Sequence, residues 1–341
     1  MKKVSIIIPV YNRELLVKKA INAALNQTYK NIEIIVINDG STDGTKTVIE
    51  KIAKSHHNIK IINQKNQGVT FARKVGLQNA SGDFIIFQDS DDIINDIYVE
   101  ELLKVQKIND ANVVIARRAQ ILNKFMTIKY TKFPRTFNIS ENPSYLAKIW
   151  LGLTCKMFKK NKIIIPDYGL KANEDLAFMY CYLAKQEKFA CSNKALYTTG
   201  ISHNSLARDF IYGNLDHIDN TIRPLEIEYN LFKENEIITK YSLELEAVFI
   251  KNIMERIVNI RQSKEPRKVQ DKLIGILLNY LSSRFPDWRQ NKYLQRRFVG
   301  FPFDSFFYLN LALPTALKTS EVASGELDTV EMFKKTLRRE K

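Results

Sequence analysis

The chain has 341 residues, of which 45% are hydrophobic and 26% charged, a composition that excludes a disordered or fibrous protein. Its three cysteines show no Cys-x-x-Cys spacing, which argues against a disulfide framework or a structural zinc site and favours a reducing compartment. The net charge of +15 indicates an anionic partner, which can be nucleic acid, an acidic lipid surface or a phosphorylated substrate.

The first 120 residues alternate between short apolar runs and stretches with helical spacing of apolar side chains. The runs predict strands at 4–8, 32–37, 59–62, 84–87 and 112–116, and the stretches predict helices at 14–25, 45–54, 69–79 and 96–108. This order is typical of an α/β protein with a mostly parallel, Rossmann-like sheet flanked by helices. Because ligands bind at the carboxyl ends of parallel strands, we expect the polar loops that follow these strands to share one edge.

The rest of the chain is less regular. Residues 121–225 contain one clear expected helix, at 174–184, and residues 226–283 are expected to be mainly helical. We therefore expect a domain at 1–225 and a helical, basic C-terminal region at 226–341.

An acidic cluster follows the fourth expected strand directly. Asp89, Asp91 and Asp92 lie within four residues, and their carboxylates repel one another at neutral pH. A divalent cation relieves that repulsion, and oxygen ligands of this kind suit Mg²⁺ or Mn²⁺. We expect Asp89 and Asp91 to share a metal with a diphosphate. The alternative is an Asx turn or a helix cap, since a helix is expected after Asp92.

Two further loops follow the first and second expected strands. In the first loop Pro9 fixes the backbone, and Tyr11 offers an aromatic face and a hydroxyl group to a base or a ribose. In the second loop Asp39 can accept the ring N–H of a uracil in a charge-assisted hydrogen bond. Residues 41–43 of the same loop also fit a cap of the next helix.

A third loop, residues 66–73, leads into the helix expected at 69–79. Gly68 permits a tight turn before that helix. Arg73 lies in the first turns of the helix and brings a cation near the expected ligand edge, unless it is a solvated surface arginine.

These four segments, in this order and spacing, resemble the inverting family 2 glycosyltransferases of the GT-A fold, of the type that builds bacterial surface polysaccharides or lipooligosaccharides. The matching stretches, all within residues 1–110, are VSIIIPVYN, IEIIVINDGSTDGT, NQGVTFARKVGL and ASGDFIIFQDSDD. The resemblance implies a nucleotide-sugar-binding half at 1–116 and an acceptor-binding half at 117–225. It implies that the nucleotide sugar is held by Pro9, Val10, Tyr11, Asn12, Asp39, Asn66, Gly68, Arg73, Asp89 and Ser90. Asp91 becomes the main metal ligand, with Asp89 beside it.

An inverting displacement also needs a carboxylate that takes the proton of the acceptor hydroxyl. The pair Glu174-Asp175 resembles the family's Glu-Asp motif, which implies that Asp175 is the catalytic base and Glu174 supports it. Acids at the start of a helix are also common capping residues, so the residues alone leave both interpretations open.

A polar segment near residue 205 supplies two more candidates. His203 can be a third metal ligand or a phosphate donor, and Ser205 can bond phosphate oxygens. An ordinary surface or core histidine is the alternative for His203. No two basic residues flank Ser205 closely, which departs from the family pattern. Arg117 and Arg118, after the fifth strand, either reach the donor sugar or face solvent.

The resemblance thus implies a hexosyltransferase that moves a sugar from a nucleotide-sugar donor, with UDP favoured, to a hydroxyl of a glycan or lipid-linked glycan, by metal-assisted single displacement. One alternative is a sugar-nucleotide nucleotidyltransferase on a related fold, opposed by the lack of glycine in the loop after the first strand. Another is a basic nucleic-acid-binding protein, opposed by the acidic cluster at 89–92. An inactive scaffold is opposed by the acids at 89, 91 and 175.

The C-terminal region carries much of the positive charge. Residues 261–300 hold ten Lys or Arg against three Asp or Glu, interleaved with aromatic residues. This pattern favours attachment to an anionic membrane surface through residues 261–310; a helical extension packed on the catalytic domain, or an oligomer contact, is the alternative. The apolar run at 4–8 is too short for a signal peptide, and no membrane span is expected. The expected location is therefore cytoplasmic, on the inner face of a bacterial inner membrane.

Overall fold

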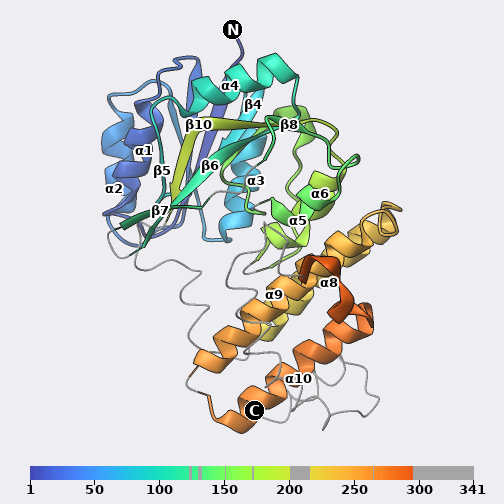
Figure 1. Cartoon of the computed structure of the whole chain (residues 1–341). Helices are drawn as coiled ribbons and strands as arrows, with labels where there is room; N and C mark the ends of the chain where they lie inside the picture. Colours follow the sequence, from blue (N-terminus) through green and yellow to red (C-terminus); the bar gives the residue numbers. More distant parts are fainter. Residues whose placement is uncertain are drawn as a thin grey trace. The chain divides into compact units, whose positions relative to one another are not determined.

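The structure is a computed structural model, and the chain forms two compact units (Figure 1). The first unit comprises Met1–Tyr145 and Ile149–Ser205, and the second comprises Leu146–Lys148 and Leu206–Lys341. The residues that the structure describes are 1–122, 125–129, 133–149, 151–170, 173–199, 216–263 and 265–294.

The first unit is built on one mixed sheet, whose strand order within the described residues is β3-β2-β1-β4-β9-β6-β10-β5, with β7 beside β6 and β8 beside β10. The strands are β1 Val4–Val10, β2 Ile32–Asp39, β3 Ile59–Gln64, β4 Phe84–Phe87, β5 Ile93–Ile94, β6 Val113–Leu122, β7 Phe125–Lys129, β8 Thr136–Phe137, β9 Lys156–Lys159 and β10 Phe189–Thr199. The predicted α/β class with a central sheet flanked by helices is confirmed.

The first four predicted strands pair in parallel, as expected. β1 lies between β2 and β4, and β2 also pairs with β3. The fifth predicted strand, β6, runs in the same direction but is not the neighbour of β4. The short strand β9 lies between them and is antiparallel to both. The carboxyl ends of β1, β2 and β4 therefore share one edge, which we call the carboxyl edge.

Helices cover both faces of this sheet (Figure 1). They are α1 Val17–Leu25, α2 Thr45–Ala53, α3 Val69–Asn79 and α4 Tyr98–Asn109. The further helices before residue 200 are α5 Ser144–Lys148 and α6 Met179–Ala184, with the 3-10 turns η1 Lys160–Lys162 and η2 Asp175–Ala177. Apolar residues of α1, α2 and α4 pack with Ile6 and Ile8 on one face. On the other face α3 approaches so closely that a Cβ on Gly76 would stand 2.4 Å from Ile7 Cγ2. Because both faces are covered, β1 is buried at every residue.

The single helix predicted at 174–184 is wrong. Asp175–Ala177 is one 3-10 turn, and α6 begins only at Met179. Phe178 separates the two, because its φ of −147° lies far from the helical value of about −63°. The acids at 174 and 175 therefore sit on a short separate element, whose position depends on its contacts rather than on a long helix.

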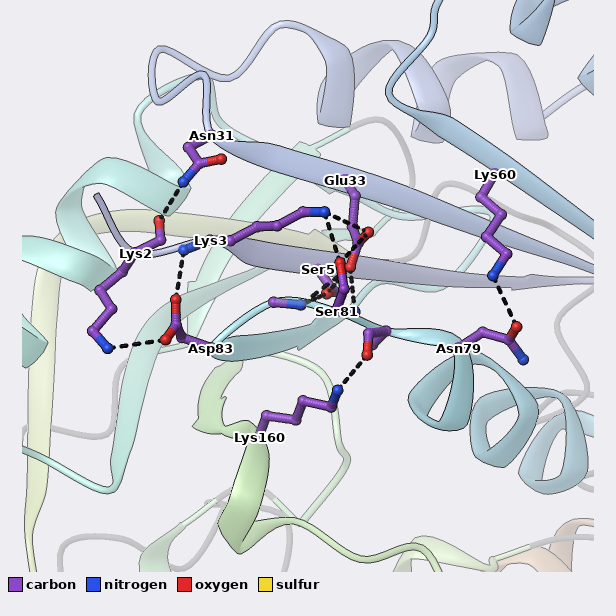
Figure 2. A network of polar contacts seen from close by, with 12 residues as sticks. Lys2, Lys3, Ser5, Asn31, Glu33, Lys60, Asn79, Ser81, Asp83 and Lys160 are labelled. Carbon is purple, nitrogen blue, oxygen red and sulfur yellow. Dashed lines mark hydrogen bonds and ion pairs between the residues drawn. The ribbon is translucent and has the colours of Figure 1, made fainter.

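A polar network joins the amino ends of β1 and β2 to the turn before β4 (Figure 2). The Ser5 hydroxyl donates to Glu33. Ser81 donates to the same carboxylate through its amide, at 2.6 Å, and its hydroxyl, at 2.8 Å, and Lys3 Nζ lies 2.9 Å away. Burial opposes the charge of Glu33, but these hydrogen bonds from Ser5, Lys3 and Ser81 lower its pKa to about 2.

A second acid completes this amino-edge network, which consists of Lys2, Lys3, Ser5, Glu33, Ser81 and Asp83. Asp83 accepts a hydrogen bond from Lys2 Nζ at 2.9 Å and from the amide of Lys3 at 2.8 Å (Figure 2). The hydrogen bonds from Lys2 and Lys3 lower the pKa of Asp83. At this edge Glu33 and Asp83 each accept several hydrogen bonds, which stabilise their ionised forms.

The second unit is helical where the structure describes it, as predicted for residues 226–283. Its helices are α8 Asp216–Glu234, α9 Ser242–Gln262 and α10 Arg267–Arg284, followed by the 3-10 turns η3 Trp288–Gln290 and η4 Lys292–Leu294. The three helices pack against one another. α8 continues across residue 225, the end of the expected first domain.

Two aromatic residues of the basic stretch, Trp288 and Tyr293, lie inside this unit. Trp288 is fully buried, and its Nε1 donates to Ser282 Oγ at 3.2 Å. Tyr293 is buried as well, and its hydroxyl donates to Glu244. These two rings therefore stabilise the helical unit and are not exposed to a membrane. Residues 295–310 of the expected membrane segment lie outside the described residues. Among the helices that the structure describes, none combines the length and the apolar character of a membrane span.

Candidate active site

The loop after β1 is tied to the loop after β2. Pro9 and Val10 are the last buried residues of β1, and Tyr11 follows with 43% of its surface exposed. Asn12 has a φ of 50°, a conformation that asparagine tolerates better than most residues. Its Oδ1 accepts the amide N–H of Thr42 at 2.8 Å. The Tyr11 ring is thus presented at the carboxyl edge from a loop that is held in place.

Asp39, at the end of β2, fixes the loop after β3. Its Oδ1 accepts hydrogen bonds from Gln64 Nε2 at 2.8 Å and from the amide of Gln67 at 2.9 Å. Its Oδ2 accepts the amide of Gly68 at 2.9 Å. A carboxylate offers about four acceptor positions, so roughly one remains on Oδ2 for a ligand. The sequence predicted a base-binding acid here but gave no sign of this loop-holding role.

Asn66 and Gly68 lie where the loops after β2 and β3 meet. A Cβ on Gly40, whose φ is 73°, would stand 2.7 Å from the Asn66 backbone nitrogen, so only glycine lets these loops approach. Gly68 has a φ of 90° and precedes α3 directly. Residues 65–68 form neither a turn nor a bend, so the tight turn predicted at Gly68 is wrong, although its φ is one that glycine permits; the Asn66 side chain is exposed at the same place.

Arg73 gathers the acids of the site. Its Nη2 lies 2.9 Å from Asp89 Oδ1, in the loop after β4. Its Nη1 lies 2.8 Å from Glu174 Oε1 and 3.3 Å from Asp175 Oδ1. The residue is only 5% exposed, so the alternative of a solvated surface arginine is wrong. One guanidinium therefore joins residues that are about a hundred positions apart in the chain.

The charges around Arg73 are unbalanced, since one guanidinium faces three carboxylates. Burial works against the charge of Arg73, but Asp175, Asp89 and Glu174 raise its pKa, so it stays protonated. Burial, and then the nearby Asp175 carboxylate, raise the pKa of Glu174 to about 7 despite the ion pair with Arg73. Glu174 therefore exchanges a proton close to neutral pH.

Asp175 is held through both carboxylate oxygens. Oδ1 faces Arg73, and Oδ2 accepts the amide N–H of Leu153 at 3.0 Å. Leu153 precedes β9, the strand that the sequence did not predict. The orientation of Asp175 thus depends on a segment that no motif marked.

The loop after β4 is anchored by a tyrosine on β10. The amide of Asp89 donates to the hydroxyl oxygen of Tyr197 at 3.0 Å, and Ser90 is buried beside it. Burial, and then the Asp89 and Asp91 carboxylates, raise the pKa of Asp92 to about 8, although a hydrogen bond with Tyr197 opposes the shift. Asp92 is therefore a buried residue under the loop, whereas Asp89 and Asp91 remain the candidate ligands.

The predicted metal ligands are only partly within the described residues. Asp91 Oδ2 lies 3.9 Å from Arg13 Nε, and Asp89 uses one oxygen for Arg73. In the described ranges no three His, Cys, Asp or Glu side chains are grouped so as to hold a metal ion. His203 and Ser205 lie outside those ranges. The carboxylate oxygens of Asp89 and Asp91 nevertheless have the hard donor chemistry that Mg²⁺ or Mn²⁺ prefers.

Arg117 and Arg118 lie on β6 and contact β10. Arg117 Nη1 donates to the carbonyl oxygen of Asn193 at 2.8 Å, and Arg118 Nη2 lies 3.5 Å from Thr199 Oγ1. Both side chains thus interact with the protein itself. Tyr197 and Leu153 hold two of the candidate acids through hydrogen bonds that sequence reasoning missed; a tyrosine in an apolar strand and a backbone amide carry no recognisable pattern.

Comparison with known proteins bears on this arrangement. Residues 5–162 match the family described as Glycosyl transferase family 2. Putative glycosyltransferase EpsH of Bacillus subtilis is 43% identical over 160 residues, which are 47% of this chain and 46% of EpsH. Glycosyltransferase GlyA of Streptococcus pneumoniae is 46% identical over 102 residues, which are 30% of this chain and 15% of GlyA. The chain thus spans less than half of either relative.

A longer but weaker similarity covers most of the chain. The cholesterol galactosyltransferase of Borreliella burgdorferi is 27% identical over 295 residues, which are 81% of this chain and 82% of that protein. Among solved structures, S. aureus TarS 1-349 in complex with UDP-GlcNAc has a TM-score of 0.59 at 20% identity, covering 84% of this chain and 89% of that chain. The mannosyltransferase PcManGT from Pyrobaculum calidifontis, in complex with GDP-Man and Mn²⁺, has a TM-score of 0.52 at 12% identity, covering 93% of this chain and 81% of that chain.

These similarities define the class of the protein. The fold is the GT-A fold of glycosyltransferases, which confirms the expectation from the sequence. Within it, residues 5–162 are similar to the family described as Glycosyl transferase family 2.

Proposed function

We propose that the protein is an inverting glycosyltransferase that moves a sugar from a UDP-sugar to a hydroxyl group of a glycan or lipid-linked glycan. The observation that carries the proposal is the buried Arg73, which brings Asp89 together with Glu174 and Asp175. The match of residues 5–162 to family 2 supports a sugar nucleotide as donor, and the similarity to TarS, solved in complex with UDP-GlcNAc, favours a UDP-sugar.

The nucleotide would bind at the carboxyl edge. The exposed ring of Tyr11 offers a stacking face for the base, and the remaining acceptor position of Asp39 suits the ring N–H of uracil. Mg²⁺ or Mn²⁺, held by Asp91 and Asp89, would neutralise charge on the leaving diphosphate. Residues 1–116 would thus form the donor half of a catalytic domain that ends with the first unit, at Ser205.

Asp175 is the proposed base. As the acceptor oxygen bonds to the anomeric carbon, the bond from that carbon to the diphosphate oxygen breaks, and the hydroxyl proton passes to Asp175. Attack opposite the leaving group inverts the anomeric configuration. Arg73 and the Leu153 amide hold both Asp175 oxygens, which keeps the carboxylate oriented before the acceptor arrives.

Glu174 is the second candidate for the base. The observation that favours it is its pKa of about 7, the value at which a general base works best near neutral pH. Its contact with Arg73 at 2.8 Å is the shorter of the two and opposes proton uptake.

The test is turnover and thermal stabilisation with UDP-GlcNAc, UDP-galactose and GDP-mannose, each with and without Mn²⁺. Asp175→Asn should abolish sugar transfer and leave UDP affinity within about twofold, because the base acts only in the transition state. Asp110→Asn, at an exposed acid away from the site, is the matched control and should behave as wild type. Metal-dependent stabilisation by none of the three sugar nucleotides would contradict the donor site. If Asp175→Asn keeps sugar transfer and Glu174→Gln loses it, the base is Glu174 and not Asp175.

We also propose that the second unit attaches the enzyme to an anionic membrane surface on the cytoplasmic side. Exposed cations of the described basic stretch support this: Arg267, Lys268, Lys272, Arg289 and Lys292. Because Trp288 and Tyr293 are buried, the attraction would be electrostatic and should weaken with salt. Flotation with phosphatidylserine vesicles tests it: replacing the five cations by Gln should release the protein, and unchanged flotation would contradict the proposal.

A further inference from the structure

Lys156 is a lysine where the fold would favour an apolar residue. It is the first residue of β9, in the middle of the sheet, and its exposure is 0%. Its Nζ donates to the carbonyl oxygen of Gly152 at 2.6 Å and lies 3.4 Å from that of Thr154. Burying an ammonium costs several kcal/mol before its contacts are counted, roughly as much as they return. Stability alone therefore does not explain this lysine.

The ammonium closes a turn of unusual geometry, formed by residues 152–155. Cys155 ends the turn with a φ of 62°, in the left-handed region that costs a residue with a side chain about 1–2 kcal/mol. On the other side, the carbonyl oxygen of Cys155 accepts the amide of Ala116 at 2.9 Å. The turn is thus held between β6 and Lys156, and losing the ammonium removes the internal partner of two carbonyl groups.

This turn is also what holds Asp175. The amide N–H of Leu153, inside the turn, donates to Asp175 Oδ2 at 3.0 Å, while the Arg73 contact to Oδ1 is longer, at 3.3 Å. Because η2 is a single 3-10 turn, the carboxylate has no long helix to orient it. The position of its Oδ2 therefore follows the position of the Leu153 amide.

The charge of Lys156 is sensitive to pH. Burial lowers the pKa of Lys156 to about 8, against the opposing effects of Cys155 and Asp175. Arg118, on β6, lowers it further. Cys155, Asp175 and Arg118 are thus charged or titratable groups of the described residues that act on the ammonium from the elements around it. The ammonium thus loses its proton just above neutral pH, and the hold on the turn weakens there.

We propose that Lys156 is a positioning residue for the catalytic base: its ammonium fixes the turn at 152–155 so that the Leu153 amide holds the Asp175 carboxylate. The inference rests on the proposed function, in which Asp175 takes the acceptor proton. Lys156 touches neither donor nor acceptor in this account, so its loss should change the rate of the chemical step and not the affinity for the nucleotide.

The experiment compares Lys156→Met with Lys159→Met, the same change on the same strand at a lysine that pairs with the exposed Asp110. Turnover of the sugar nucleotide accepted by the wild type is measured from pH 6 to 10, with UDP affinity by calorimetry. Lys156→Met should lower kcat about tenfold to a hundredfold, as expected for a base displaced by about 1 Å, and change the Kd of UDP less than about twofold. Lys159→Met should match the wild type.

A double-mutant cycle separates positioning from general damage. If Lys156 acts through Asp175, adding Lys156→Met to Asp175→Asn should not lower the residual turnover further. The kcat of the wild type should fall above about pH 8, and the kcat of Lys156→Met should show no such fall. Any of three results would overturn the inference. The double variant multiplies the two losses of kcat, both lysine variants lose kcat equally, or Lys156→Met keeps the kcat of the wild type. Should Lys156→Met fail to fold, the wild-type profile decides: kcat that stays flat to pH 9.5 overturns the inference.

The experiments distinguish a failure of the proposed function from a failure of the proposed role of Lys156. If wild-type protein turns over no sugar nucleotide, or Asp175→Asn keeps its turnover, the proposed base is wrong and the role of Lys156 falls with it. If Asp175→Asn abolishes turnover and Lys156→Met leaves it unchanged, only the role of Lys156 is wrong.

Discussion

The two edges of one sheet handle acidic side chains in opposite ways. At the amino edge, hydrogen bonds from serine, lysine and backbone groups overcome burial and lower the pKa of Glu33 to about 2 (Figure 2). At the carboxyl edge, burial and neighbouring acids raise the pKa of Glu174 to about 7 and that of Asp92 to about 8. The amino-edge network therefore stabilises the fold, while the carboxyl edge stores unfavourable charge that a cation, a diphosphate or an acceptor proton can relieve.

The largest effect on stability is expected at the carboxyl edge, where one cation faces three acids. Arg73→Met should lower the free energy of unfolding by about 2–4 kcal/mol, because it removes a buried cation and leaves three partly buried carboxylates without their shared partner. Urea denaturation at pH 7.5 measures it. Lys60→Met, at an exposed lysine on β3, is the control and should change stability by less than about 0.5 kcal/mol. A loss under about 1 kcal/mol for Arg73→Met would show that the acids are not held by this residue.

Glu33→Gln tests the amino edge. A folded-state pKa of about 2, against 4.5 in the unfolded chain, corresponds to roughly 2–3 kcal/mol of stability from the ionised form. Since the folded pKa is depressed, this stability is complete above pH 4.5 and is lost as pH falls toward 2. Denaturation at pH 7 and at pH 3 should therefore show a large difference between Glu33→Gln and wild type that shrinks in acid. A difference that does not depend on pH would contradict the account.

Glu174→Gln should raise the free energy of unfolding, whereas Glu33→Gln lowers it. Because the folded-state pKa is raised from 4.5 to about 7, the ionised form destabilises the fold, fully above pH 7 and progressively less as pH falls through 7 to 4.5. The variant should gain about 1–3 kcal/mol of unfolding free energy at pH 8 and almost nothing at pH 4.5. Denaturation curves at the two pH values test it, and a loss of stability at pH 8 would contradict the claim that this edge stores unfavourable charge.

The smallest expected effect is that of Ser5→Ala. The Ser5 hydroxyl donates to Glu33 and accepts the amide of Gly82 at 2.9 Å, so its removal should cost about 1–2 kcal/mol. Ser55→Ala, at an exposed serine after α2, is the control. Thermal unfolding of the two variants compares them directly, and equal midpoints would mean that the amino-edge network does not contribute through Ser5.

The sequence predicted the strands and loops of the donor half well, because there each apolar run ends in a loop with its own Gly, Asn or Asp signal. It did not predict β9, since the four residues of Lys156–Lys159 are too short for a period and have charged ends. It also merged η2 with α6, because the apolar spacing continues through Phe178 while the backbone does not. Both misses affect the placement of the acids at 174 and 175.

The candidate site, like the fold, could be predicted from the sequence only in part. Asp39, Asp89 and Asp91 were recognisable from their place after a strand, and the Glu174-Asp175 pair from its resemblance to a family motif, but the contact of Arg73 with Glu174 depends on tertiary packing across a hundred residues. The aromatic and basic pattern around Trp288 fitted both a membrane surface and a helical core; burial places the rings of Trp288 and Tyr293 in the core, and the proposed membrane attachment then rests on the exposed cations alone. Local patterns thus located the candidate chemistry, and long-range contacts assigned the partners.

The central claim is that the carboxyl edge, and not the amino edge, holds the nucleotide. Calorimetric titration of UDP in the presence of Mn²⁺ into wild type, Asp39→Asn and Asp83→Asn tests it most directly. The account predicts equal affinity for wild type and Asp83→Asn, and a loss of about tenfold to a hundredfold for Asp39→Asn, the value of a hydrogen bond to a charged acceptor. Equal binding by Asp39→Asn, or a loss confined to Asp83→Asn, would contradict it.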